Sequence, residues 1–274
     1  MKNPLKNCSI GLGVTGSIAS YKALDLASKL VQQGASVHPL MTSGAAKIVT
    51  PLAFTAITHN SVALNLYDPS SDIGMDHVSV AKTIDMLIVA PATANTVAKM
   101  ALGIADNPVT TTYLATESPV LVIPAMDGNM YCNEATQTNI KTLENRGVQI
   151  LGPFLGHLAS GLQGIGRMAE TNEIVDHAKL VLAQNGDMAN QKIVVTAGGT
   201  KEPLDPIRVI TNRSSGKMGF AIAEAARDRG ASVTVITSSN ENQPIAGVET
   251  VIAETVDEMA SQTKIHAKKA NVLI

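Results

Sequence analysis

Short apolar runs that contain no charged side chain are the feature that most constrains the fold of this chain. They are MLIVA at residues 86–90 and VLVIP at residues 120–124. Strands of this kind are buried on both faces, as in parallel sheets covered by helices. Parallel strands need helical crossovers, and residues 18–33 and 136–145 have the spacing of such helices. The pattern predicts an α/β fold with a parallel sheet that carries helices on both faces.

The turn after residues 86–90 has the composition of an anion-binding site. Pro91 ends the apolar run, small and hydroxyl-bearing residues follow at 92–96, and we expect a helix from about Val97. This order places backbone N–H groups and hydroxyls at the positive end of a helix, where phosphate groups bind. Ligands of parallel sheets bind beyond the carboxyl ends of the strands. The other turns expected at that edge are also small, polar or glycine-bearing, namely residues 15–17, 42–44 and 124–130.

A polar linker at residues 183–191 divides the chain. After it, the order of strand, glycine turn, helix and strand restarts over residues 192–253, and residues 271–274 begin a further strand. We therefore predict one domain at residues 1–183 and the first part of a second, Rossmann-like α/β domain at residues 184–274, with an incomplete sheet. In the alternative interpretation, residues 271–274 form a short edge strand.

The composition disfavours several classes of protein. The net charge of −2 gives no long-range attraction to nucleic acid or to an anionic membrane, and no segment reaches the ~18 apolar residues of a membrane span. Cys8 and Cys132, the two cysteines, lack a CxxC spacing, which disfavours a disulfide framework and a zinc site. We expect a cytoplasmic protein with no nucleic-acid or membrane partner, and the sequence predicts no metal ligands.

Three glycines, Gly11, Gly13 and Gly16, match the GxGxxG spacing of dinucleotide-binding turns. The match is weak, because the second expected strand ends in Leu-Met-Thr at residues 40–42 without the acidic residue that would hold a ribose. Gly11 and Gly13 also fall within the first expected strand, and only Gly16 falls in the turn. A mononucleotide phosphate, or an ordinary turn between strand and helix, fits better than NAD.

Two polar positions are candidates for chemistry. His77 could act as a base that titrates near neutrality, although Asp76 could simply cap a short helix with His77 incidental to it. Asp127 follows a buried strand, where site residues are common. Met126 and Met130 flank it and could fill the core, which is the usual role of methionine.

Two glycine-containing segments are candidates for binding. Residues 156–166 have no helical or strand period, and they form either a plain long turn or a mobile flap over a site, with Arg167 as the nearby anion partner. Residues 212–219 precede an expected helix and resemble a phosphate loop, but they do not match GxxxxGK[ST]. By themselves they are a generic anion-binding candidate.

Several of these segments occur in an order that resembles one family. They are GVTGSIASYKA at 13–23, the His77 region, and the segments at 90–107, 124–139, 156–170 and 196–219. Together they resemble the bifunctional flavoproteins of coenzyme A biosynthesis, which join phosphopantothenoylcysteine decarboxylase to phosphopantothenate–cysteine ligase. The last segment is specific to the ligase half, so the resemblance disfavours a stand-alone cysteine decarboxylase.

The resemblance implies a flavodoxin-like domain that binds FMN at the subunit contacts of a trimer-based homo-oligomer. The FMN contacts that it implies are Gly16, Ser17, Ser43, Thr93 and Asn95. By the same resemblance we expect His77, Asp127 and Ser160 to be catalytic, and Asp127, Met130 and Arg167 to contact the substrate. The flavin oxidises the terminal cysteine of the substrate to a thioaldehyde, CO₂ leaves, and the ene-thiol is then reduced. The ligase half would use CTP and Mg²⁺, with Asn212, Ser215 and Lys217 in its site.

Two residues depart from the family pattern: Ser160 stands where the flap usually has a cysteine, and Asp127 where PAMN has asparagine. A serine hydroxyl is a far weaker acid than a thiol, whose pKa is about 8.5. We hypothesise that Asp127, held protonated by the nearby substrate carboxylate, binds that carboxylate and can pass its proton on.

Other outcomes stay open for the first domain. It could stop at the oxidised ene-thiol because the flap has Ser160, or it could be a non-catalytic flavin-binding regulatory homologue, although the presence of His77 argues against the latter. An NAD-binding oxidoreductase is disfavoured by the missing acidic residue. Most ligase contacts expected from the family would lie after Ile274, so we expect no ligation by residues 191–274 alone.

Overall fold

The computed structural model describes residues 3–66, 76–159, 161–238 and 244–274, but not the side chains of residues 76–79. The contacts within the chain divide it into two units. One is Leu5–Ala178, and the larger part of the other is Lys179–Ile274. Each unit has its own parallel sheet, so each is described separately.

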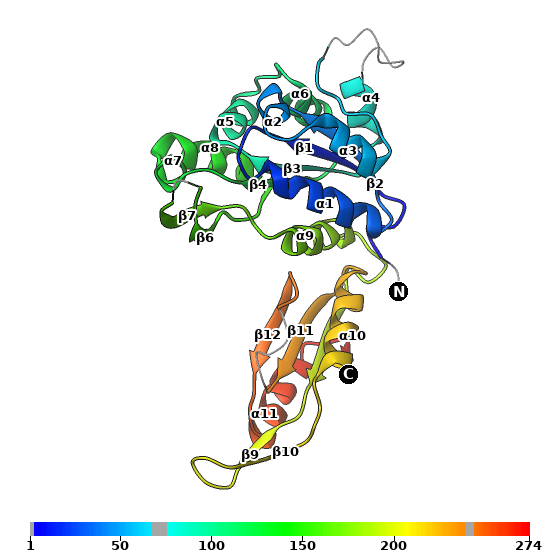
Figure 1. The fold of residues 1–274 in the computed structure, drawn as a ribbon. Helices are drawn as coiled ribbons and strands as arrows, with labels where there is room; N and C mark the ends of the chain where they lie inside the picture. The colour runs from blue at the N-terminus through cyan, green and yellow to red at the C-terminus, as the bar shows by residue number, and fades with distance from the viewer. Residues whose placement is uncertain (1–2, 67–75, 160, 239–243) are drawn as a thin grey trace. The chain divides into compact units, whose positions relative to one another are not determined.

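The first unit contains a sheet of five parallel strands in the order β2-β1-β3-β4-β5 (Figure 1). Relative to chain order this is 2-1-3-4-5, the flavodoxin-like arrangement, and it confirms the predicted fold class. The strands are β1 (Ser9–Val14), β2 (Ser36–Met41), β3 (Met86–Ala92), β4 (Val120–Pro124) and β5 (Gln149–Ile150).

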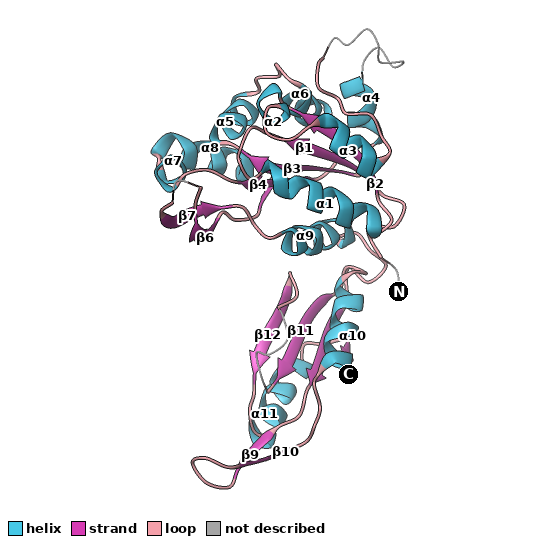
Figure 2. Ribbon diagram, viewed as in Figure 1, coloured by secondary structure: helices cyan, strands magenta, loops and turns pink. Residues whose placement is uncertain are grey.

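Helices cover both faces of this sheet (Figure 2). One face packs on α5, α6 and α8, whose Val97, Val109 and Ile140 share a buried cluster with Leu87 and Val122 of the strands. The other face is covered by α1. Among the described residues, no helix is long and apolar enough to cross a membrane. The helices are α1 (Ser20–Gln32), α2 (Ser43–Ala46), α3 (Pro51–Thr58), α4 (Asp76–Thr83), α5 (Ala94–Leu102), α6 (Pro108–Ala115), α7 (Gly128–Cys132), α8 (Glu134–Asn145) and α9 (Thr171–Ala183).

Two glycines of the GxGxxG spacing lie inside β1, as predicted, and they serve helix packing. A Cβ atom on Gly13 would lie 2.8 Å from Cγ1 of Val109 on α6, and one on Gly11 would lie 3.1 Å from Cδ1 of Ile84. A side chain at residue 13 would therefore clash with α6, and one at residue 11 would make the Ile84 side chain shift. The glycines are therefore explained without a dinucleotide.

The prediction that Pro91 ends the third strand is wrong, because β3 continues to Ala92. The ladder with β4 shifts register between Val89 and Ala92, and Ala92 then pairs with Pro124. Such irregularities accommodate proline, which cannot donate a ladder hydrogen bond. The helix that follows also starts earlier than expected, at Ala94, because the Thr93 hydroxyl accepts a hydrogen bond from the N–H of Thr96 at 3.3 Å and caps it.

Residues 156–166 are more regular than their sequence suggests. They lie in an antiparallel hairpin of β6 (Phe154–His157) and β7 (Gln163–Arg167), in place of the expected segment without a strand period. Four glycines between 156 and 166 hide the alternation of side chains on which strand prediction depends. A register shift between Phe154 and Leu155 disturbs the period further.

The second unit has four parallel strands in the order β12-β11-β8-β13. This is 3-2-1-4 in chain order, which matches the first strands of the predicted Rossmann-like sheet. Helix α10 packs on one face through Ala223 and Ala226, and Met259 of α11 packs on the other. The elements are β8 (Lys192–Ala197), β9 (Lys201–Pro203), β10 (Val209–Thr211), α10 (Lys217–Arg227), β11 (Ser232–Thr237), β12 (Val248–Ile252), α11 (Val256–Ala267) and β13 (Val272–Leu273). β9 and β10 form an antiparallel hairpin.

His38 on β2 gives the first unit a pH-dependent stability. Burial lowers the pKa of His38, so the unfolded chain binds this proton more tightly than the folded chain. The free energy of unfolding should therefore fall as the pH drops below about 6.5, the ordinary pKa of histidine, until the lowered folded-state pKa is passed. The free energy of unfolding of His38→Gln, measured by urea titration, should fall less over this pH range than that of the wild type. An identical pH dependence in both proteins would contradict this role of His38.

Candidate active site

Thr15 joins the turns that follow β1 and β3. Its buried hydroxyl donates to the carbonyl oxygen of Pro91 at 2.7 Å and accepts from the N–H of Thr93 at 3.0 Å. In a sheet of order 2-1-3-4-5, β1 and β3 flank the point where the strand order reverses, and ligands bind there. The side chain of Thr15 therefore holds together the two turns that would surround such a ligand.

The turns after β1 and β2 also approach each other closely. A Cβ atom on Gly16 would lie 3.1 Å from the carbonyl carbon of Gly44, a tight approach that would make one of these backbones shift slightly. Thr42 caps α2 by accepting from the N–H of Ala45 at 3.2 Å, and Ser43 is the first residue of that helix. Three predicted cofactor positions, Gly16, Ser43 and Thr93, thus lie on turns at the carboxyl ends of adjacent strands. The other two, Ser17 and Asn95, lie on the same turns or in the first turn of α5.

A cavity of about 440 Å³ opens beside these turns. Its walls are residues 17–19 and 21–22 at the start of α1, residues 125–127 after β4, and residues 157–159 and 166–168 of the β6–β7 hairpin. Three predicted site residues line it: Ser17, Asp127 and Arg167. The other predicted residues of this domain that the structure describes are not among its lining residues, and Met130 is 50% exposed on α7.

Asp127 caps α7, because its Oδ1 atom accepts from the N–H of Asn129 at 3.0 Å. Aspartate and asparagine are equally good residues at this position of a helix, and both offer the same side-chain oxygen. The loop conformation therefore does not explain why this chain has aspartate. What aspartate changes is the charge and the proton that the side chain can carry into the cavity.

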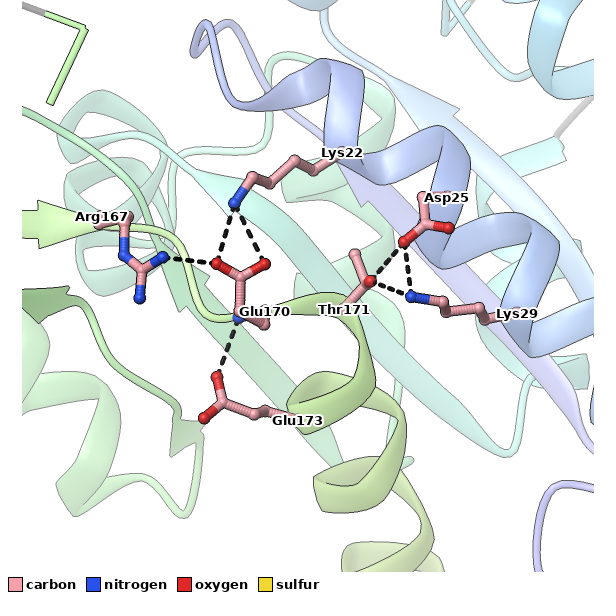
Figure 3. Close-up of polar contacts among 7 residues, drawn as sticks. All are labelled: Lys22, Asp25, Lys29, Arg167, Glu170, Thr171 and Glu173. Carbon is pink, nitrogen blue, oxygen red and sulfur yellow. Dashed lines mark hydrogen bonds and ion pairs between the residues drawn. The ribbon is translucent and has the colours of Figure 1, made fainter. Parts of the chain in front are cut away.

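Two cations at the cavity wall share one carboxylate (Figure 3). Lys22 Nζ lies 3.3 Å from Oε1 of Glu170, and Arg167 Nη1 lies 2.6 Å from the same atom. Lys22 comes from α1 and Arg167 from β7, and both line the cavity. Glu170 neutralises one of the two cations and the Asp127 carboxylate also lines the cavity, so Lys22 and Arg167 supply hydrogen-bond donors for an anionic group of a ligand and no net positive charge.

A second group of contacts fixes Glu170 (Figure 3). Its backbone N–H donates to Oε2 of Glu173 at 3.0 Å, in the manner of the third residue of a helix reaching back to the helix start. Beside it, Thr171 donates to Asp25, and Lys29 Nζ lies 2.8 Å from the same carboxylate. The Lys29 and Thr171 hydrogen bonds lower the pKa of Asp25. These contacts tie the start of α9 to α1.

Two predicted catalytic residues fall outside the described part of the structure. Ser160 is not described, and His77 lies in α4 but its side chain is not described. The structure instead brings a histidine to the cavity that the sequence analysis missed, His157 at the end of β6. The one feature that could have indicated it is the pairing of His157 with Gln163 across the β6–β7 hairpin, and the glycines hide the alternation by which this hairpin could be predicted.

The predicted residues of the second unit lie on the loop before α10. Asn212 Oδ1 accepts from the N–H of Ser214 at 3.0 Å, and a Cβ atom on Gly199 would overlap Asn212. This places the loop against the turn that follows β8. Ser215 and the first helical residue, Lys217, are exposed.

Comparison with known proteins identifies the family. The family model described as Flavoprotein matches residues 1–182, about two thirds of the chain. The chain belongs to the flavoprotein family. The model of the DNA/pantothenate metabolism flavoprotein C-terminal domain matches residues 188–274 of this flavoprotein.

The curated relatives are bifunctional proteins of coenzyme A biosynthesis, called CoaBC. The flavoprotein is 41% identical to the one from Vibrio cholerae over 96% of its own length and 66% of that protein. It is 42% identical to the one from Escherichia coli K12, over 97% of its own length and 65% of that protein. The chain thus spans about 65% of the length of these relatives.

Solved structures resemble the first unit. A PPC decarboxylase mutant in complex with pantothenoylaminoethenethiol is 26% identical, with a TM-score of 0.58, and the match covers 64% of this chain and 98% of that one. The FMN-dependent cysteine decarboxylase SpaF is 27% identical, with a TM-score of 0.56, and covers 66% of this chain and 98% of its own.

Proposed function

We propose that the first unit binds FMN and decarboxylates 4′-phosphopantothenoylcysteine to 4′-phosphopantetheine. The observation that carries this proposal is the Thr15 hydroxyl, which joins the turns at the point where the strand order reverses, next to a cavity that Lys22 and Arg167 line. The names of the relatives support the same reaction: CoaBC for the whole chain and PPC decarboxylase for this fold.

The donor set at the three turns fits FMN. The five proposed contacts carry hydroxyl, amide or glycine backbone donors and no carboxylate, which suits a phosphate and a polar ring edge. They are Gly16, Ser17, Ser43, Thr93 and Asn95. FMN bound there supplies an acceptor, and later a donor, for one pair of electrons.

The cavity residues hold the substrate in this proposal. Arg167 and Lys22 attract an anionic group of the substrate, and His77 accepts the proton of the substrate thiol. Met130 contacts the substrate from α7, the helix that Asp127 caps. Asp127 is protonated when the substrate carboxylate lies next to it, because two adjacent carboxylates cannot both ionise readily. In that form it donates a hydrogen bond to the substrate carboxylate and holds a proton ready for the reduction, where Ser160 is too weak an acid.

Replacing Asp127 by asparagine tests this role. Asparagine keeps the α7 cap but cannot pass on a proton, so product formation should fall about 100-fold, the contribution typical of a positioned acid. Flavin content and melting temperature should not change. Initial rates of 4′-phosphopantetheine formation, measured by mass spectrometry, check this. Asp106→Asn is the control, because Asp106 pairs with Lys99 and is not among the described residues that line the cavity. Unchanged turnover in Asp127→Asn would reject the role.

For residues 188–274 we propose a share in the site of a CTP- and Mg²⁺-dependent phosphopantothenate–cysteine ligase. Asn212, Ser215 and Lys217 would contribute to it, because they lie on a loop that packs against the turn after β8 at the carboxyl ends of the strands. The exposed side chain of Lys217 is available to an anionic group.

We further propose a trimer-based homo-oligomer in the cytoplasm. Large exposed apolar side chains at the cavity support self-association. Ile18 and Tyr21, which line the cavity, are each 59% exposed. A neighbouring subunit would cover them and complete the walls of the FMN site.

The decarboxylase proposal is tested by incubating the FMN-loaded chain with 4′-phosphopantothenoylcysteine and measuring the products by mass spectrometry. We expect a product 44 mass units lighter than the substrate, because that is the mass of the CO₂ lost. A product two units lighter than 4′-phosphopantetheine indicates that the reaction stops at the oxidised ene-thiol. Unconsumed substrate rejects the proposal and favours the flavin-binding regulatory homologue.

A further inference from the structure

His157 is a titratable side chain in the cavity that the proposed mechanism does not use. It lies at the end of β6 and lines the cavity together with Asp127, Arg167 and Lys22. It is exposed, so water can return a proton to it. No other histidine among the residues with described side chains lines this cavity.

Gln163 fixes the orientation of the His157 ring. The two residues are paired across the β6–β7 hairpin, and Nε2 of Gln163 lies 3.3 Å from Nε2 of His157. An amide nitrogen donates and cannot accept, so Nε2 of the ring is the acceptor in this arrangement. The proton of the neutral ring then sits on Nδ1. The charged ring carries a proton on each nitrogen, so its Nε2 donates and the Gln163 amide, rotated by half a turn, accepts through its oxygen.

The chemistry of the cavity needs an acid that ordinary side chains rarely supply near neutral pH. Ser160 has no acidic proton of use, and imidazole is the side chain whose charge ordinarily changes between pH 5 and 8. A positioned general acid works best when it titrates near the operating pH. His157 has that chemistry and a fixed ring within the same cavity.

We propose that His157 is the general acid that protonates carbon in the last step of the decarboxylation, with Gln163 as its positioning residue. This inference rests on the proposed function. Reduction of the carbon–carbon double bond of the ene-thiol needs one hydride and one proton. The reduced flavin would supply the hydride, and the imidazolium of His157 supplies the proton. Two C–H bonds form, the C=C π bond is lost, and neutral imidazole is left. Asp127 binds the substrate carboxylate before CO₂ leaves, and the proton that Asp127 held then recharges the imidazole of His157, which lines the same cavity.

The charges around the ring are compatible with this cycle. The titratable groups that share the cavity with His157 are Tyr21 and Lys22 of α1, Asp127 before α7 and Arg167 of β7. Glu170 neutralises one of the two cations at 2.6 Å from Arg167. The imidazolium therefore faces a carboxyl group as well as cations, and its proton can leave to a carbon that is gaining electron density.

The first test separates the two halves of the reaction. FMN-loaded wild type and His157→Gln are given 4′-phosphopantothenoylcysteine, and mass spectrometry measures substrate loss and the ratio of ene-thiol to 4′-phosphopantetheine. With substrate below the concentration of the FMN-loaded protein, so that each flavin is reduced at most once, we expect equal substrate loss and a ratio about 100-fold higher in the variant. Gln163→Leu should give an intermediate ratio, and Leu155→Ala, an exposed change in the same hairpin, should give the wild-type ratio.

The second test does not depend on turnover. Diethylpyrocarbonate labels accessible imidazoles, and peptide mass spectrometry reads each histidine separately. Pantothenoylaminoethenethiol should protect His157 of the FMN-loaded protein and leave the exposed His59 at the end of α3 unprotected. A wild-type ratio in His157→Gln, or equal labelling of His157 with and without the compound, would overturn the role of His157. Substrate that is not consumed by wild type would instead overturn the proposed function.

Discussion

Replacing Gly166 by alanine should separate the β6–β7 hairpin from the loop after β4 and lower the activity strongly. Gly166 has φ of +142°, and its Cβ would lie 2.1 Å from the carbonyl oxygen of Met126. The carbonyl of Gly166 also accepts from the N–H of Met126 at 3.1 Å. The strain and the clash together should destabilise the first unit by about 2–4 kcal/mol. Turnover should fall about 100-fold, because a shift of about 1 Å moves Arg167 relative to Asp127.

Gly164 is the matched control on the same strand. A Cβ atom there would lie 3.6 Å from Cδ1 of Leu158, which is an ordinary van der Waals contact. Gly164→Ala should therefore keep wild-type stability in urea unfolding and wild-type rates of product formation. Equal behaviour of Gly164→Ala and Gly166→Ala would contradict the role given to the contact between β7 and the Met126 loop.

Replacing Thr15 by valine should weaken FMN binding and destabilise the first unit. Valine has nearly the same shape but no hydroxyl, so the buried carbonyl of Pro91 and the N–H of Thr93 each lose a partner. The two unsatisfied groups should cost about 2–4 kcal/mol of unfolding free energy. The turns after β1 and β3 would no longer be held together, and we expect FMN affinity to fall at least about tenfold. Quenching of FMN fluorescence during titration measures this directly.

Thr15→Ser separates the hydroxyl from the shape of the side chain. Serine keeps both hydrogen bonds and loses one methyl group, so its FMN affinity should stay within about threefold of wild type. If valine and serine weaken FMN binding equally, the hydroxyl does not organise the site.

The sheet could be predicted from the sequence because its strands are buried on both faces. β1 and β4 begin and end at the expected residues, since apolar runs bounded by turn residues mark strands of this kind. The strand order, by contrast, follows from which helices cross over which face, and family resemblance supplied it. Pro91 was misjudged because a register shift in β3, which sequence alone does not reveal, accommodates it.

The site could be predicted only where residues adjacent in sequence form a turn. Ser17 and Asp127 were found because each follows a buried strand. Thr15 was noted only as part of a turn, because its role depends on a contact with residues 76 and 78 positions away. His157 and Lys22 reach the cavity from a hairpin and a helix, and no local pattern connects them.

The most direct test of the account is the absorbance spectrum of the purified chain before and after addition of FMN. The proposed cradle of turns after β1, β2 and β3 predicts a yellow protein with the bands of oxidised flavin and one FMN per chain, retained through gel filtration. A colourless protein that does not retain added FMN would contradict the account, whatever its fold.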